Sequence, residues 1–227
     1  MLIEASSRTE ETDPFCLPSP RAAELLARAP WRRFAGIGDS LSAGTGGPSP
    51  GYASLGWPDR VADVLRRVHP DLAYLNLAEV GATTAGALAT QFDRIAEFAP
   101  DLLHLPCGAN DLFHARPDFT VIEGKLRQLF ALAAGTGAQL TTFTLGRAFV
   151  VPGFPDWPDR VRTVNAITRE VARDHGALVI DMADHPVNDR PDLLSADGIH
   201  FSASGQAVLA AEVVRSLAGL LDTTTPE

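Results

Sequence analysis

The sequence contains few of the residues on which metal, disulfide and lysine chemistry depend. Its two cysteines, Cys16 and Cys107, stand far apart and share no C-x-x-C or zinc-type spacing. His104 and His114 are not joined by H-E-x-x-H or any other metal-binding spacing. The single lysine, Lys125, lies in an ordinary amphipathic segment, which disfavours Schiff-base and serine–lysine chemistry. The sequence therefore predicts neither a disulfide framework nor a metal site.

Long apolar runs and positive charge are also scarce. No stretch reaches the roughly 18 consecutive apolar residues of a membrane span. Residues 1–15 include acidic residues where a secretory signal would have a basic and then an apolar region. The formal net charge is −9 at pH 7, and no Lys/Arg cluster offsets it, which disfavours nucleic acid as a partner. We therefore expect a cytoplasmic protein that inserts in no membrane and acts on a small organic molecule.

Short apolar runs alternate along the chain with amphipathic segments. Strands are predicted over residues 33–39, 72–78, 101–106, 138–145 and 177–182. Helices are predicted from residue 57, up to residue 98, and over residues 119–134, 157–174 and 204–221. This alternation is typical of parallel strands joined by right-handed crossovers. It predicts an α/β fold, a three-layer α/β/α sandwich around a five-stranded parallel sheet.

The domain organisation predicted from composition is one domain with two short extensions. Residues 1–30 are expected to form a loosely attached leader with a short helix over residues 21–29. Residues 31–222 form the domain, which is long enough for one substantial core. Residues 223–227 are expected to be a flexible tail.

Polar residues suited to acyl transfer follow several of the predicted strands. Ser40 comes directly after the first strand, at the sheet edge where ligands of such folds bind. A serine nucleophile needs a base oriented by a third group, and Asp197 and His200 supply both in a D-x-x-H segment. Gly81 follows the second strand and Asn110 the third, so that their N–H groups are candidate donors to an oxyanion.

Four segments, in the same order along the chain, resemble the sequence blocks of the SGNH/GDSL hydrolase superfamily. They are GIGDSLSAG (36–44), NLAEVGATT (76–84), CGAND (107–111) and DGIHFSASG (197–205). The resemblance implies a flavodoxin-like hydrolase fold and an esterase, lipase, thioesterase or carbohydrate deacetylase activity without metal or organic cofactor. It further implies a catalytic triad of Ser40, Asp197 and His200, with Ser40, Gly81 and Asn110 as oxyanion donors.

The function expected from these residues is hydrolysis of a carboxylic ester, of a small molecule or of an acyl or acetyl conjugate, through an acyl-enzyme on Ser40. Three alternatives stay open. An acyltransferase or a thioesterase would use the same site, and a non-catalytic binding module would retain the fold alone.

A second serine also stands in a hydrolase-like pattern. Ser49 lies in Gly47-Pro48-Ser49-Pro50-Gly51, which matches the G-x-S-x-G pattern of nucleophile elbows. That elbow follows a strand and uses the N–H of the residue after the serine, whereas this segment lies in a loop and Pro50 has no N–H. The glycine-rich stretch around it lacks the spacing of a nucleotide-binding loop. Ser40 is therefore the better candidate.

The segment after the fourth strand is the candidate acyl pocket. Its apolar residues Phe149, Val150, Phe154 and Trp157 should border the site, which favours apolar acyl or aryl groups. The alternative is that these aromatic residues only anchor a proline-rich loop.

Overall fold

The computed structural model describes residues 8–223, and its centre is a parallel β-sheet. The strands lie in the order β2-β1-β3-β4-β5, and every neighbouring pair runs parallel. In chain order they are β1 (Arg33–Gly36), β2 (Ala73–Asn76), β3 (Leu102–His104), β4 (Gln139–Phe143) and β5 (Leu178–Ile180). The predicted α/β fold with a five-stranded parallel sheet is confirmed.

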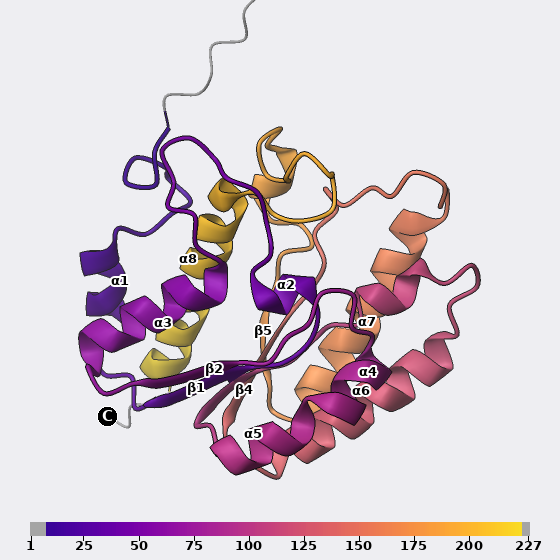
Figure 1. The fold of residues 1–227 in the computed structure, drawn as a ribbon, viewed down its shortest axis with the longest axis horizontal. Helices are drawn as coiled ribbons and strands as arrows, with labels where there is room; N and C mark the ends of the chain where they lie inside the picture. The colour runs from indigo at the N-terminus through magenta and orange to yellow at the C-terminus, as the bar shows by residue number, and fades with distance from the viewer. Residues whose placement is uncertain (1–7, 224–227) are drawn as a thin grey trace, which may run out of the picture.

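Helices cover both faces of this sheet and complete the three layers (Figure 1). One face carries α1 (Ser19–Leu25), α3 (Trp57–Val68) and α8 (Ala203–Thr223). The other carries α4 (Thr84–Thr90), α5 (Phe92–Phe98), α6 (Phe119–Ala134) and α7 (Trp157–Asp174). Three short helices, α2 (Ser40–Ala43), η1 (Asn110–Phe113) and η2 (Pro186–Asp189), follow β1, β3 and β5. These short helices gather at the carboxyl edge of the sheet.

The strands divide their side chains between two hydrophobic cores. Phe34 and Leu102 pack with α3 and α8, whereas their neighbours Ala35 and Leu103 pack with α6 and α7. This alternation follows from the two-residue period of a strand, and it explains why consecutive strand residues such as Phe34 and Ala35 are both apolar and buried. With both faces covered, the open edge at the carboxyl ends of the strands is where loops can form a site.

Several elements differ from the sequence expectation in extent. Helices α6 and α7 have the predicted bounds, but the observed strands are shorter than the apolar runs that predicted them. The helix expected up to residue 98 is broken at Gln91, which ends α4 and precedes α5. The three short helices after the strands were not predicted. Each is about one turn long, too short to show a periodic apolar pattern.

The leader is more firmly attached than we expected. Its helix spans Ser19–Leu25, and Cys16, Ala22 and Leu26 are buried in the same core as α3 and α8. The leader therefore packs as part of the domain from Cys16 onward, because it supplies apolar side chains that cover α3 and α8. The proposed tail begins at Thr223, the last residue of α8, and residues 224–227 lie outside the described residues.

No helix within residues 8–223 is long and apolar enough to cross a membrane.

Candidate active site

Ser40 is the first residue of α2, directly after a sharp turn that leaves β1. Gly38 adopts a φ of 131°, and a Cβ at this position would lie 2.5 Å from Ser42 Oγ and 2.9 Å from Pro106 Cβ. Only glycine fits there, both sterically and conformationally. Asp39 then caps α2 by accepting a hydrogen bond from Leu41 N at 3.0 Å. The turn places Ser40 at the N-terminus of a helix and at the edge of the sheet.

Gln91 holds this turn from the neighbouring helical layer. Its side-chain amide is buried and forms two hydrogen bonds with the backbone of Gly38. Gly38 N donates to Gln91 Oε1 at 2.7 Å, and Gln91 Nε2 donates to Gly38 O at 3.0 Å. The break between α4 and α5 therefore coincides with a polar side chain that fixes the segment before Ser40. Sequence reasoning missed this residue, because the contact joins positions far apart in the chain.

Asp39 is a buried carboxyl group beside the candidate nucleophile. Burial is the main cause that raises its pKa to about 6, and hydrogen bonds from the N–H groups of Leu41 and Ser42 oppose the shift. The nearby carboxylate of Asp111 raises the pKa further. Asp111 is itself tied to α4, because it accepts hydrogen bonds from Thr84 N and Oγ1. Asp39 thus combines a capping role with an unfavourable ionisation.

This ionisation predicts an unusual pH dependence of stability. A pKa that is higher in the folded chain than the ordinary value of about 3.9 means that stability is fully present below pH 3.9 and declines as pH rises toward 6. Asp39→Asn can still accept from Leu41 N without ionising. Its free energy of unfolding, relative to the wild type, should therefore increase by about 2 to 3 kcal/mol between pH 4 and pH 8. Urea unfolding of both proteins at the two pH values measures this, and an unchanged difference would contradict it.

Asp197 and His200 form a hydrogen-bonded pair in the loop between β5 and α8. His200 Nδ1 lies 2.7 Å from Asp197 Oδ2. Asp197 Oδ1 accepts from the backbone N–H groups of Ile199 and His200 at 2.9 and 3.0 Å. These bonds, that from the His200 side chain first, lower the pKa of Asp197 to about 2. An ionised Asp197 can hold the ring with Nδ1 protonated and leave Nε2 free to accept a proton.

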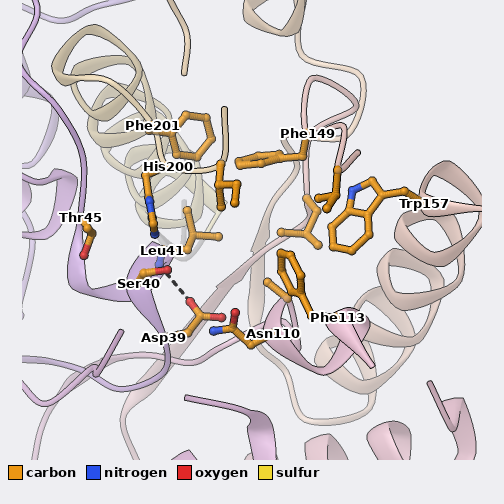
Figure 2. Close-up of a pocket in the computed structure, with 14 residues that line it drawn as sticks. Asp39, Ser40, Leu41, Thr45, Asn110, Phe113, Phe149, Trp157, His200 and Phe201 are labelled. Atoms are coloured by element: carbon orange, nitrogen blue, oxygen red, sulfur yellow. Dashed lines mark hydrogen bonds between the residues drawn. The ribbon is translucent and has the colours of Figure 1, made fainter. Parts of the chain in front are cut away.

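Ser40 and His200 line one cavity at the carboxyl edge of the sheet. In Figure 2 the ring of His200 points toward Ser40, and Asn110 lies on the other side of the serine. No hydrogen bond joins Ser40 to His200 within residues 8–223, and bonds of this kind often tighten only around a ligand. The D-x-x-H segment thus faces Ser40 across the cavity.

The three candidate oxyanion donors differ in position. Asn110 lines the cavity, and its Nδ2 donates one hydrogen bond to Ala82 O at 3.0 Å, which leaves its second N–H available. Ala82 adjoins Gly81, so this bond links Asn110 to the turn after β2. Gly81 lies on the exposed part of that turn with a φ of 84°, and it is not among the residues lining the cavity. In the described chain, neither Ser40 N nor Gly81 N donates to a protein acceptor.

The wall of the cavity is largely apolar, but only part of it was predicted. Of the four residues proposed for the acyl pocket, Phe149 and Trp157 line it. Val150 does not, since it is 64% exposed, and Phe154 lies outside the lining and packs against Trp157. The apolar lining residues that sequence reasoning missed are Leu41, Ala109, Phe113, Leu145, Val151, Ile199 and Phe201. Most of these follow strand ends, which is the one signal that could have found them.

The described residues offer no metal site. No group of three or more His, Cys, Asp or Glu side chains within residues 8–223 is arranged to hold a metal ion. His104 is buried in β3, where Thr141 Oγ1 lies 3.0 Å from its Nδ1, and burial lowers its pKa to about 3. Both cysteines are buried and free.

The sequence matches a known family and one curated relative. A model of the GDSL-like lipase/acylhydrolase family matches residues 37–208, a range that contains all five predicted catalytic and oxyanion residues. The GDSL lipase Rv0518 of Mycobacterium tuberculosis is 28% identical over 188 residues, which cover 78% of each chain.

Solved structures share the fold at lower identity. TesA superimposes with a TM-score of 0.68 at 23% identity, over 83% of this chain and 99% of the TesA chain. Axe2, an acetylxylan esterase from Geobacillus stearothermophilus, gives a TM-score of 0.66 at 19% identity, over 82% of this chain and 94% of its own.

Proposed function

The chain belongs to the GDSL-like lipase/acylhydrolase family and is a carboxylic ester hydrolase, and on this premise we propose that it works through an acyl-enzyme on Ser40. The observation that carries the proposal is the hydrogen-bonded Asp197–His200 pair in a cavity shared with Ser40. A serine hydroxyl is a weak nucleophile at its ordinary pKa, so a base held in one tautomer opposite it is the feature that the chemistry requires.

In the first step His200 Nε2 takes the proton of Ser40 while Oγ bonds to the ester carbonyl carbon. The carbonyl oxygen becomes an oxyanion in the tetrahedral intermediate. His200 then gives the proton to the departing alcohol oxygen as its bond to carbon breaks. Asp197 stays ionised throughout and stabilises the imidazolium, which agrees with its low pKa of about 2.

In the second step water replaces the alcohol. His200 removes a proton from water as its oxygen bonds to the acyl carbon, and the bond to Ser40 Oγ breaks with return of the proton. The products are the free acid and the regenerated serine. Every proton is thus passed through one ring nitrogen, and the reaction needs neither metal nor organic cofactor.

Oxyanion stabilisation is proposed for Ser40 N, Gly81 N and Asn110 Nδ2. The free N–H groups of Ser40 and Gly81 and the second amide proton of Asn110 support this. Asn110→Ala should lower kcat by about 10²-fold, because one donor among several is lost where charge develops. Hydrolysis of p-nitrophenyl butyrate measures the loss, and a thermal melt shows whether the link to Ala82 matters for folding. A decrease below threefold in a folded variant would remove Asn110 from the mechanism.

Labelling tests the nucleophile directly. A fluorophosphonate should attach to Ser40 and to no other serine, as located by peptide mass spectrometry of the purified protein. His200→Ala should slow labelling strongly, because the base that activates Ser40 is lost. No label, or a label on another serine such as Ser49, would overturn the proposal.

The largely apolar wall supports an acyl chain as the group that occupies the cavity. Aromatic and aliphatic side chains from four separate loops face this space, whereas its polar members gather around Ser40. We therefore expect kcat/KM for p-nitrophenyl esters to increase from acetate to butyrate and hexanoate. Equal or falling values along this series would contradict an apolar acyl pocket.

Finer assignments stay predictions. Transfer of the acyl group to an alcohol, or cleavage of a thioester, would use the same Ser40 intermediate. Acyl transfer would show in a water–alcohol mixture as a fraction of new ester among the products that exceeds the mole fraction of the alcohol. A cytoplasmic location is likewise a prediction from the sequence alone.

A further inference from the structure

Trp157 carries a buried hydrogen-bond donor without a partner. The residue is 3% exposed, and its Nε1 is one of three buried side-chain polar atoms in residues 8–223 that have no hydrogen-bond partner. The other two belong to Arg8 and Thr142, and neither of those residues lines the catalytic cavity. Trp157 does line it. Buried N–H groups are almost always paired, so an unpaired one at a cavity wall points to a ligand atom.

The indole ring is held in place from several sides. Trp157 is the first residue of α7, and Pro158 follows it in the first turn. Its ring centroid lies 4.9 Å from that of Phe113 and 6.0 Å from that of Phe154. The guanidinium of Arg160 covers Phe154 at 4.7 Å from its ring centroid. The contacts with Phe113 and Phe154 hold the indole ring in this orientation, which sets the direction of its N–H donor.

The position of the nitrogen suits an acyl chain that starts at Ser40. Figure 2 shows Trp157 across the cavity from Ser40, with the indole nitrogen on the edge of the ring toward Phe149. No Lys or Arg is among the lining residues. A carboxylate at the nitrogen would therefore lose its hydration without gaining a cation, whereas a neutral oxygen would satisfy the donor at little cost.

We propose that Trp157 Nε1 donates a hydrogen bond to a neutral oxygen in the acyl group of the substrate. The preferred substrates are then esters of oxo acids, in which a second carbonyl stands along the chain beyond the ester. This rests on the proposed function, in which the acyl chain occupies the cavity. The indole N–H selects the position of that oxygen, because its place in the wall is fixed while the chain is anchored at Ser40.

Esters that differ only in the position of a second carbonyl test whether the enzyme selects the position of that oxygen. The p-nitrophenyl esters of hexanoic acid and of 3-, 4- and 5-oxohexanoic acid are compared by kcat/KM, each divided by its rate with hydroxide to remove intrinsic reactivity. The wild type should prefer one oxo isomer over hexanoate by about tenfold. Trp157→Phe, which keeps an aromatic ring but removes the N–H, should bring that preference close to one. Phe154→Leu, which removes the more distant aromatic neighbour but keeps the N–H and the closer contact with Phe113, should retain most of the preference.

Nuclear magnetic resonance gives a readout that needs no catalysis. Trp31, Trp57 and Trp157 each give one indole N–H signal in protein labelled with ¹⁵N. Binding of the favoured oxohexanoate, the reaction product, should shift the Trp157 signal downfield, and hexanoate should not. The Trp31 signal is an internal reference, since Trp31 is buried in the core with α3 and α8 and does not line the cavity.

Three results would overturn the inference: hexanoate equal to every oxo isomer, a preference that survives in Trp157→Phe, or a Trp157 signal that no oxo acid moves. Failure of the proposed function looks different. It would appear as no hydrolysis of any ester and no phosphonate on Ser40, and the indole signal would still report whether oxo acids bind at Trp157.

Discussion

Ser40→Ala should lower kcat/KM for p-nitrophenyl butyrate on the order of 10⁴- to 10⁶-fold, by comparison with other serine hydrolases that lose their nucleophile. Without Oγ no acyl-enzyme forms, and His200 has no hydroxyl to activate. The oxyanion donors would remain, so we expect a weak residual activity in which water attacks the ester directly. The variant should fold normally, because the hydrogen bond that caps α2 joins Leu41 N to the Asp39 carboxylate and does not involve Ser40 Oγ.

Ser49→Ala is the matched control for this result. Ser49 stands in the G-x-S-x-G pattern, and its Oγ accepts a hydrogen bond from Ser204 N at the start of α8. That contact is structural, so Ser49→Ala should keep activity within about threefold of the wild type and lose at most about 1 kcal/mol of stability. Loss of activity in the Ser49 variant but not in the Ser40 variant would reverse the assignment of the nucleophile.

The architecture could be predicted because its signals are local. The strands were found from short, largely apolar runs, and the helices predicted over residues 119–134 and 157–174 are α6 and α7 in the structure. Asp118 accepts hydrogen bonds from Thr120 N and Val121 N, which is what an N-cap residue does. Boundaries set in this way by neighbouring residues agreed with the structure.

Features that depend on distant contacts were not predictable in the same way. The helix breaks at Gln91, where the side chain forms hydrogen bonds with Gly38. The residues around Gln91 in the sequence give no signal of this break. The leader was expected to be loose because it is polar and rich in proline. Its burial depends on surfaces of α3 and α8 that exist only in the folded chain.

The candidate site likewise has a part that depends on local sequence and a part that depends on distant contacts. Asp197 and His200 lie three residues apart, so one turn brings them together and their spacing is readable from the sequence. The cavity opposite them is assembled from several loops. Phe113 and Phe201, for example, enter it from η1 and from the loop before α8, and their roles could not be inferred before the loops were placed.

The leader is also joined to the catalytic loop by a buried ion pair. Arg190 Nη1 and Nη2 lie 2.5 and 2.6 Å from the two carboxylate oxygens of Asp13, whose side chain is fully buried. Tyr52 donates a further hydrogen bond to Asp13 at 2.8 Å, and the Arg190 guanidinium lies 4.5 Å from the centroid of the Phe15 ring. Arg190 follows η2 directly and stands seven residues before Asp197, so the pair anchors the segment that leads into the proposed triad.

Asp13→Asn should lower the free energy of unfolding by about 3 to 5 kcal/mol, because it leaves the Arg190 guanidinium buried without its counter-ion. Urea unfolding at pH 7 measures the loss. The double variant Asp13→Asn, Arg190→Met should recover part of it, since no unpaired charge then remains. Arg8→Met is the matched control, because Arg8 joins the same leader to Asp192 through a partly exposed pair at 3.3 Å and should cost less than about 1 kcal/mol.

The same pair predicts how the wild type responds to acid. Although burial opposes it, hydrogen bonds from Arg190, Phe15 N and Tyr52 lower the pKa of Asp13 to about 2. A pKa lower in the folded chain than the ordinary value of about 3.9 contributes stability that is present above pH 3.9 and lost as pH falls through 2. The difference in unfolding free energy between wild type and Asp13→Asn should therefore be constant from pH 5 to 8 and shrink below pH 4. A constant difference down to pH 2.5 would show that the Asp13 charge does not stabilise the link between leader and catalytic loop.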